Sequence, residues 1–171
     1  MSALGNVHEL HLNGCTGITD VSALGNVHEL HLNRCTGITD VSALGNVHEL
    51  DLDGCTGIKD VSALGNVHKL SLCKCNVTVI RDLPNLCDLD ISFCSNIEEV
   101  MNLPNLININ ADGCSKLRVL RNLPKLRSLN ARDCVMLIEV SQVSDEFPAF
   151  DIRGCKQLKE IKSMTKVLRL S

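Results

Sequence analysis

Apolar residues return along this chain in a fixed order, about once every 20 residues. A recurring cysteine marks the period most clearly, because it stands at residues 15, 35, 55, 75, 94, 114, 134 and 155. Self-similarity at a fixed period of this size is the signature of a repeat array in which each unit stacks on its neighbours. The pattern therefore predicts eight stacked turns of one solenoid.

Within each turn the spacing of the apolar residues predicts one short strand. Leu30 and Leu32 are separated by a single residue, which is the alternation of a β-strand, whereas the other apolar gaps are three residues long. We expect parallel strands at residues 9–13, 29–33, 49–53, 69–73, 88–92, 108–112, 128–132 and 149–153. Their inward residues would stack in one column: Leu10, Leu30, Leu50, Leu70, Leu89, Ile109, Leu129 and Phe150.

The length of a turn limits what can follow the strand. Twenty residues cannot hold a strand and a full α-helix, so the rest of each turn should be coil or a short 3₁₀ helix. The predicted fold class is an α/β-type repeat solenoid with one curved parallel sheet on its concave side and short 3₁₀ or turn segments on its convex side.

Small and polar residues predict the corners. An aspartate precedes each early Val-Ser-Ala-Leu motif, where its side chain can cap one helical turn (Asp20, Asp40, Asp60). A glycine follows the motif and is expected to end the turn in a left-handed conformation (Gly25, Gly45, Gly65). Later repeats carry proline instead, so their backbone should differ there (Pro84, Pro104, Pro124). We expect one domain over residues 1–171, with near-identical repeats to residue 75 and divergent ones over 76–171.

The repeat resembles a known family at these residues. The segment from Val27 to Ile38 fits the leucine-rich repeat pattern L-x-x-L-x-L-x-x-N/C-x-L, with Cys35 at the N/C position. The 20-residue, cysteine-type repeat sequence is similar to repeats in protozoan and large-virus proteins. The resemblance implies a curved parallel sheet with a concave binding face, and it implies no chemistry.

Strand alternation also decides which side chains face a partner. The outward residues are polar and mainly acidic, with the densest negative region at Glu49, Asp51, Asp53, Asp88 and Asp90 and a basic end at Arg132 and Arg153. The predicted partner-binding residues are Glu9, His11, Glu29, His31, Glu49, Asp51, Asp53, Lys69, Ser71, Asp88, Asp90, Asn108, Asn110, Asp112, Asn130, Arg132, Asp151 and Arg153. They predict a protein or peptide partner with a basic patch; the alternative is that they are solvated surface charges.

Two groups of metal-ligand residue types were weighed. His11, His31 and Asp51 would form one straight column, with steps of about 4.8 Å that suit tetrahedral coordination poorly. The second group has side chains that should point to opposite faces: His68, Cys73, Cys75 and Cys87. We therefore expect no metal and no cofactor. The chain has no nucleophile motif, phosphate loop or asymmetric catalytic cluster, so we expect no enzyme.

Composition narrows the class of partner. The net charge of −3 gives no reason to expect nucleic acid or a membrane surface. Eight of the ten cysteines follow the repeat, and equivalent side chains in a parallel ladder point the same way, so these eight should be buried thiols that bond a backbone group. Free thiols and the absence of a signal peptide lead us to expect the cytoplasm or another reducing intracellular compartment.

A second function class stays open. Solenoids need polar caps, and the sequence shows no distinct capping segment at either end. Val167 and Leu170 would begin a ninth strand of the same parallel sheet. The alternative function is thus a structural scaffold that assembles through its ends.

Overall fold

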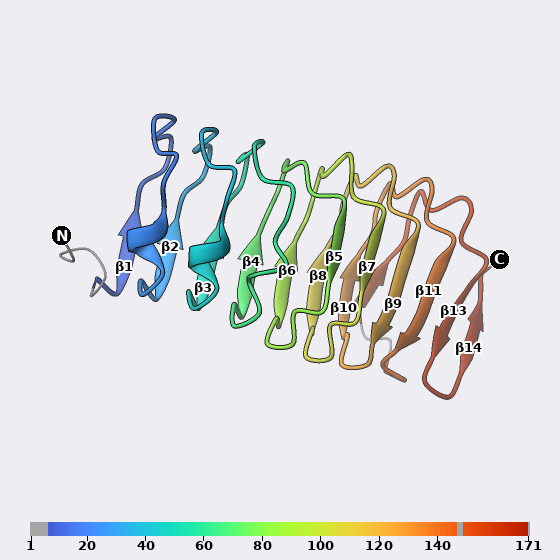
Figure 1. Ribbon diagram of the computed structural model, residues 1–171. Coiled ribbons are helices and arrows are strands. Elements are labelled where there is room, and N and C mark those ends of the chain that lie inside the picture. Colours follow the sequence, from blue (N-terminus) through green and yellow to red (C-terminus); the bar gives the residue numbers. More distant parts are fainter. Residues whose placement is uncertain (1–6, 147–148, 171) are drawn as a thin grey trace.

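The computed structural model describes residues 7–146 and 149–170, and the expected extent of the domain at residues 1–6, 147–148 and 171 lies outside them. The chain winds into a row of stacked turns, and each turn adds one short strand to a continuous sheet (Figure 1). A second sheet accompanies the first over the later turns.

The first sheet has eight strands in the order β1-β2-β3-β4-β6-β8-β10-β12. Every neighbouring pair is parallel, and each register step joins equivalent repeat positions, as in Leu10↔Leu30 and Leu30↔Leu50. The strands are β1 (Glu9–His11), β2 (Glu29–His31), β3 (Glu49–Asp51), β4 (Lys69–Ser71), β6 (Asp88–Asp90), β8 (Asn108–Asn110), β10 (Ser128–Asn130) and β12 (Ala149–Asp151). The predicted strands, their parallel pairing and the stacked inward column are confirmed.

Each strand is two residues shorter than predicted because the backbone turns directly before the recurring cysteine. The residue at that position has a positive φ in all eight turns: Gly14, Arg34, Gly54, Lys74, Phe93, Gly113, Asp133 and Gly154. A left-handed residue cannot continue the extended backbone of a strand. The prediction that Gly25, Gly45 and Gly65 are left-handed was wrong. Gly25 and Gly45 have φ of −65° and −61°.

Those two glycines are needed for space. A Cβ at Gly25 would lie 2.2 Å from the carbonyl oxygen of Ala43, and one at Gly45 would lie 2.5 Å from that of Ala63. The missing side chain therefore lets the backbones of successive turns approach closely.

The early repeats have the expected short helices opposite the sheet. These are η1 (Ser22–Leu24) and η2 (Ser42–Leu44), both 3₁₀. The Asp20 and Asp40 carboxylates accept the backbone N–H of Ser22 and Ser42 at 2.9 and 2.8 Å, and this bond tightens the turn. The same bond recurs from Ser62 to Asp60. The N-cap residues are Val21 and Val41, and neither helix has a side-chain cap bond, so the aspartates hold the turn just before each helix and the predicted capping role was wrong.

The later repeats differ from the expected 3₁₀ or turn segments, because short strands take their place on the side opposite the first sheet. Six strands form a second sheet in the order β14-β13-β11-β9-β7-β5. Their bounds are β5 (Val79–Arg81), β7 (Glu99–Met101), β9 (Val119–Leu123), β11 (Glu139–Val143), β13 (Glu160–Ser163) and β14 (Val167–Arg169). Pairing is parallel except between β13 and β14.

Two substitutions in the repeat explain this second sheet. The position of Asp60 becomes Val79 in the next turn, which removes the acceptor that tightened the turn and adds a β-branched residue. The position of Ala63 becomes Asp82, with φ of 58°, in a left-handed conformation that Asp and Asn tolerate and Ala does not. Asn102 and Asn122 repeat it, with φ of 58° and 56°.

The end of the chain also differs from the expectation. Residues 167–169 form β14, which pairs antiparallel with β13, so they do not start a ninth strand of the first sheet. β14 instead folds back along the edge of the second sheet (Figure 1).

One hydrophobic core runs through the turns, from Val21 to Ile161. Seven of its cysteines donate their thiol to a carbonyl oxygen of the preceding turn at 2.9–3.1 Å, as Cys55 does to Leu32, which confirms the buried ladder for these seven. Cys15, in the first described turn, is exposed, so the expectation of a buried thiol was wrong there. No helix among the described residues is both long and apolar enough to cross a membrane. The repeat pattern and the parallel topology make the chain a leucine-rich-repeat-like solenoid.

Candidate functional site

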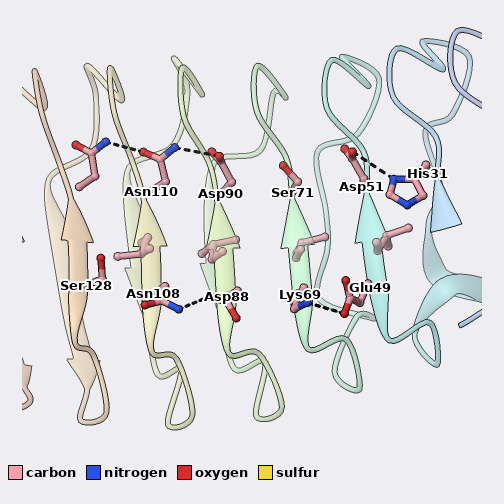
Figure 2. Close-up of a pocket in the computed structure, with 15 residues that line it drawn as sticks. His31, Glu49, Asp51, Lys69, Ser71, Asp88, Asp90, Asn108, Asn110 and Ser128 are labelled. Atoms are coloured by element: carbon pink, nitrogen blue, oxygen red, sulfur yellow. Dashed lines mark hydrogen bonds and ion pairs between the residues drawn. The ribbon is translucent and has the colours of Figure 1, made fainter. Parts of the chain in front are cut away.

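The predicted partner-binding residues lie on the outward side of the eight-stranded sheet, which we call the polar face. Those within the strands form two columns held in register by backbone pairing, so that Glu9, Glu29 and Glu49 follow one another in the first. His31 and Asp51 belong to the second column. Figure 2 shows the two columns crossing the central strands. Four predicted residues come two positions after a strand, in the turn: Asp53, Asp112, Arg132 and Arg153.

The centre of this face is a shallow hollow of about 400 Å³. Ten of the predicted residues line it: His31, Glu49, Asp51, Lys69, Ser71, Asp88, Asp90, Asn108, Asn110 and Asn130. Ser128 also lines it and was missing from the predicted set. The remaining eight are not part of its wall: Glu9, His11, Glu29, Asp53, Asp112, Arg132, Asp151 and Arg153. The structure therefore concentrates the site on β2 to β10.

One lysine balances part of the negative charge. Lys69 Nζ lies 2.7 Å from Glu49 Oε1, and this hydrogen bond raises the pKa of Lys69 above its usual value. The carboxylates of Asp88 and Asp90 accept hydrogen bonds from neutral amides, those of Asn108 and Asn110. Neutral partners leave both carboxylate charges in place.

Asp53 stands between the polar face and the core. Its Oδ1 accepts Ser71 Oγ at 2.5 Å and the backbone N–H of Cys73 at 2.9 Å. Burial raises the pKa of Asp53, and the nearby charges of Asp51 and Asp90 act in the same direction, whereas its hydrogen bonds lower it. Its negative charge is therefore held at a cost to the fold.

Side-chain amides tie neighbouring strands together on the C-terminal side of the hollow. Asn130 Nδ2 donates to Asn110 Oδ1 at 2.9 Å, and Asn110 Nδ2 donates to Asp90 Oδ2 at 3.0 Å. Asp90 also accepts the backbone N–H of Ser92 at 2.8 Å. A chain of such bonds fixes the carboxylate of Asp90 before any partner arrives.

The predicted basic end is partly neutralised within the chain. Arg153 forms a two-pronged pair with Asp151, with contacts of 2.5 and 2.9 Å. This pairing lowers the pKa of Asp151 to about 2. Arg132 lies 3.7 Å from Asp133. The acidic centre is thus the more available charged feature of the polar face.

Sequence reasoning missed a row of histidines at the starts of the strands. His8, His28 and His48 stack ring on ring with centroid separations of 4.6 Å, and the His68 ring lies 4.1 Å from that of His48 but is tilted by 31°. Burial, followed by repulsion from His68 and His28, lowers the pKa of His48. The signal was the histidine recurring every 20 residues before Glu-Leu or Lys-Leu.

The two metal-ligand groups weighed from the sequence are not the ones that the structure assembles. In the described ranges, two trios bring one ligand atom of each residue within 4.8 Å of the others: His8, His28 and Glu29, and Glu9, His11 and His31. Glu9 replaces Asp51 in the second trio. Cys75 donates to Leu52 in the core, and Cys87 donates to Asn85, so these thiols serve separate backbone carbonyls.

Comparisons with known proteins add little to this geometry. No protein-family model matches the chain, and no curated protein sequence matches it. Among solved structures, the chain is similar to an internalin from Listeria monocytogenes strain 4b F2365, at 16% sequence identity and a TM-score of 0.37. That likeness covers 87% of this chain and 71% of the internalin chain. The fold rests on the strand register and core described above, and no property of the internalin is transferred.

Proposed function

We propose that this leucine-rich-repeat-like solenoid, of the short cysteine-type repeat, binds a protein or peptide that carries a basic patch. The observation that supports the proposal most is the charge of the polar face. Four acidic residues, Glu49, Asp51, Asp88 and Asp90, line the central hollow together with a single ammonium group, Lys69. A basic partner is the electrostatic complement of such a surface.

The stiffness of the polar face supports binding as well. Its side chains stand on paired strands, and hydrogen bonds from the side-chain amides of Asn130 and Asn110 link them to Asp90. Binding to fixed side chains loses less conformational entropy than binding to mobile ones. The proposed role is recognition, with no catalytic step and no cofactor in it.

An exposed aromatic residue gives a partner an apolar contact beside the charges. Phe93 is 54% exposed in the turn after β6, although a bulky residue rarely adopts its φ of 59°. Its backbone N–H donates to Asp112 O at 2.8 Å, and Lys74 Nζ lies 5.9 Å from the ring centroid. Aromatic side chains contribute strongly to interface energies, so Phe93 is the anchor we expect.

A charge-removing pair of substitutions tests the proposal. Asp88→Asn with Asp90→Asn removes two negative charges from the hollow and keeps one acceptor oxygen at each position, although the Asp90 oxygen that accepts from Asn110 Nδ2 is replaced by an amide nitrogen. A ten-residue lysine peptide is the minimal probe, and its affinity should fall by about 1 kcal/mol, or roughly fivefold in Kd. The measurement is fluorescence anisotropy of the labelled peptide over a salt series, because added salt should weaken the same interaction.

Glu98→Gln with Glu99→Gln is the matched control, because it removes two carboxylates at β7 in the second sheet. Equal losses in both double variants would show that total charge, and not the polar face, holds the peptide. A cellular pull-down with the same three proteins then identifies partners that depend on the hollow, since these are lost with the first variant and retained with the control.

Self-assembly is the alternative function. It is favoured by β14, where Val167 and Leu168 are 56% and 44% exposed on the outer strand of the second sheet. Exposed strand edges can pair with another chain. Sedimentation velocity over a concentration series separates the two functions, because a scaffold grows with concentration and a recognition module remains monomeric.

We also propose that the protein resides in the cytoplasm or another reducing intracellular compartment. All ten cysteines are free, and those of the ladder use their thiol hydrogens in bonds to backbone carbonyls. Thiols persist where glutathione and thioredoxin keep them reduced. Fluorescence microscopy of the tagged chain tests the placement, and accumulation in an oxidising compartment would contradict it.

A further inference from the structure

We infer that Glu9, His11 and His31 form a binding site for a borderline divalent transition-metal ion such as Zn²⁺. Each of the three offers one ligand atom, and these atoms lie within 4.8 Å of one another. His11 Nε2 is 2.7 Å from Glu9 Oε1. The His11 and His31 rings stack with centroids 4.3 Å apart and planes 11° apart.

The arrangement is a triangle and not a line. A straight column of side chains on successive strands, such as His11, His31 and Asp51, cannot surround an ion. Glu9 comes instead from the first column of the same strand as His11, two residues earlier. Three ligands at the corners of a triangle form one face of a tetrahedron, and water can complete it.

To bind one ion together, the His11 ring must turn out of its stack on His31, because the nitrogen lone pairs lie in the ring planes and these planes are only 11° apart. Zn²⁺ bonds to nitrogen and oxygen at about 2.0–2.2 Å, so two ligand atoms of one ion lie no more than about 4 Å apart. The side chains of Glu9 and His11 are 51% and 55% exposed, and no core packing prevents them from turning toward the ion. His31 is more enclosed, at 30%, and is the fixed member of the group.

Asp51 is placed to orient His31. Its Oδ2 lies 3.6 Å from His31 Nδ1, and its Oδ1 accepts the backbone N–H of Asp53 at 3.1 Å. Metal-binding histidines commonly direct their second nitrogen at a carboxylate, which fixes the tautomer and the ring. Asp51 lies on the Nδ1 side of His31, so the proposal assigns Nε2 of His31 to the ion and makes Asp51 a positioning residue once the 3.6 Å contact shortens to a hydrogen bond.

The donor set selects the class of metal. Two imidazole nitrogens and one carboxylate oxygen suit Zn²⁺, Co²⁺, Ni²⁺ or Cu²⁺, whereas Ca²⁺ and Mg²⁺ take oxygen ligands. The second trio, His8, His28 and Glu29, is looser, because its carboxylate contact is 4.0 Å and its rings are 4.6 Å apart. We therefore assign the ion to Glu9, His11 and His31.

Isothermal titration of the reduced full chain with Zn²⁺ tests the assignment. His11→Asn and His31→Asn should each weaken binding at least tenfold, and Asp51→Asn should weaken it about tenfold, at the lower end of the range for such partners. His48→Asn is the matched control, because it removes a stacked imidazole that belongs to neither trio, and its affinity should equal the wild type's. Zn²⁺ should also raise the Tm of the wild type and of His48→Asn but not of His31→Asn.

Three results would overturn the proposal. One is no binding at millimolar Zn²⁺. Another is a loss of binding in His8→Asn with none in His31→Asn, which would move the ion to the other trio. The third comes from Co²⁺ absorption spectra, because a thiolate charge-transfer band would assign the ion to a cysteine such as the exposed Cys15. Nitrogen and oxygen ligands give no such band, and that spectrum is the expected one.

Discussion

At the scale of single residues, the cysteine ladder performs two tasks at each turn. Burial raises the pKa of Cys55 to about 11 and that of Cys94 and Cys134 to about 12, so these thiols stay protonated and can donate. The Leu32 carbonyl accepts both the backbone N–H of Cys35 and the thiol of Cys55. The thiol therefore links one turn to the next while filling the core.

Cys55→Ala should lower the free energy of unfolding by about 1–3 kcal/mol, because it removes the bond to Leu32 and leaves a small cavity. Urea denaturation followed by circular dichroism measures the loss. Cys73→Ala is the control, since Cys73 is half-buried and outside the ladder, and it should change stability by no more than about 0.5 kcal/mol. Equal losses would show that the ladder position is not special.

Substituting Asp53 should raise the free energy of unfolding at pH 7, in contrast to the loss expected for Cys55→Ala. The pKa of Asp53 is raised by burial, so its favourable contribution exists at low pH, below the unfolded value, and is lost as pH rises through the folded value. At pH 7 the buried charge opposes folding. Asp53→Asn keeps an acceptor for Ser71 and Cys73 and should stabilise the protein at pH 7 by up to about 0.5 kcal/mol, with no gain at pH 3.

Asp151→Asn serves as the contrast to Asp53→Asn. Hydrogen bonds from Arg153 lower the pKa of Asp151 to about 2, so its contribution is present above the unfolded pKa and fades as pH falls toward 2. This variant should lose stability at pH 7. Urea titrations at pH 3 and pH 7 test both signs, and a stabilising Asp151→Asn at pH 7 would contradict the pairing.

At the scale of elements, the sequence predicts the first sheet well because its signal is periodic. Leu30 and Leu32 alternate, and a constant period places equivalent residues in register on every strand. Strand ends were harder to predict. Glycine indicates the left-handed position after the strand in some turns, but Arg34, Lys74 and Phe93 occupy the same position in others and give no such signal. In those turns the tertiary stack imposes the conformation and overrides local preference.

The second sheet was missed for a related reason. Residues 79–81 look like one more corner when the early repeats are taken as the rule, and the change from Ala63 to Asp82 carries meaning only once a left-handed position is known to lie there. The candidate site was likewise only partly predictable from the sequence. Its columns follow from alternation, whereas the trio of Glu9, His11 and His31 depends on side-chain rotamers that periodicity does not encode.

Substitutions of Asn102 test the left-handed backbone position that ends β7 in the second sheet. Asn102 has φ of 58°, donates from Nδ2 to Asp82 Oδ1 at 2.9 Å and accepts from Asn122 Nδ2 at 3.0 Å. Asn102→Ala should destabilise by about 1–2 kcal/mol, because Ala tolerates the left-handed region poorly. Asn102→Gly keeps the backbone and loses only the side-chain bonds, so it should cost less in urea denaturation. A Gly variant as unstable as the Ala variant would assign the role to the side-chain ladder.

At the scale of the whole molecule, the two halves of the solenoid are supported differently. The early turns contribute one strand each and close with short helices or turns, whereas the later turns contribute a strand to each of two sheets. Leu10, Leu12 and Ile18 in the first described turn are only partly buried, while Ile91 and Ile109 are buried. In a repeat array each turn is stabilised by its own contacts and by its nearest neighbours.

Hydrogen exchange should therefore reveal a gradient along the array. Leu12 and Ile91 offer a matched pair of amides, because each donates at 2.8 Å to a carbonyl of the next strand, His31 O and Asn110 O. Because Leu10, Leu12 and Ile18 are only partly buried, opening the first described turn exposes less apolar surface than opening a central turn, so the Leu12 amide should exchange by local opening. NMR-detected exchange should give Leu12 a protection factor at least tenfold below that of Ile91. Urea well below the unfolding midpoint should leave the exchange rate of Leu12 nearly unchanged and accelerate that of Ile91, because only large openings are sensitive to denaturant. Equal protection and equal urea dependence would mean that all turns open together, and the solenoid would then unfold as a single cooperative unit despite its two kinds of repeat.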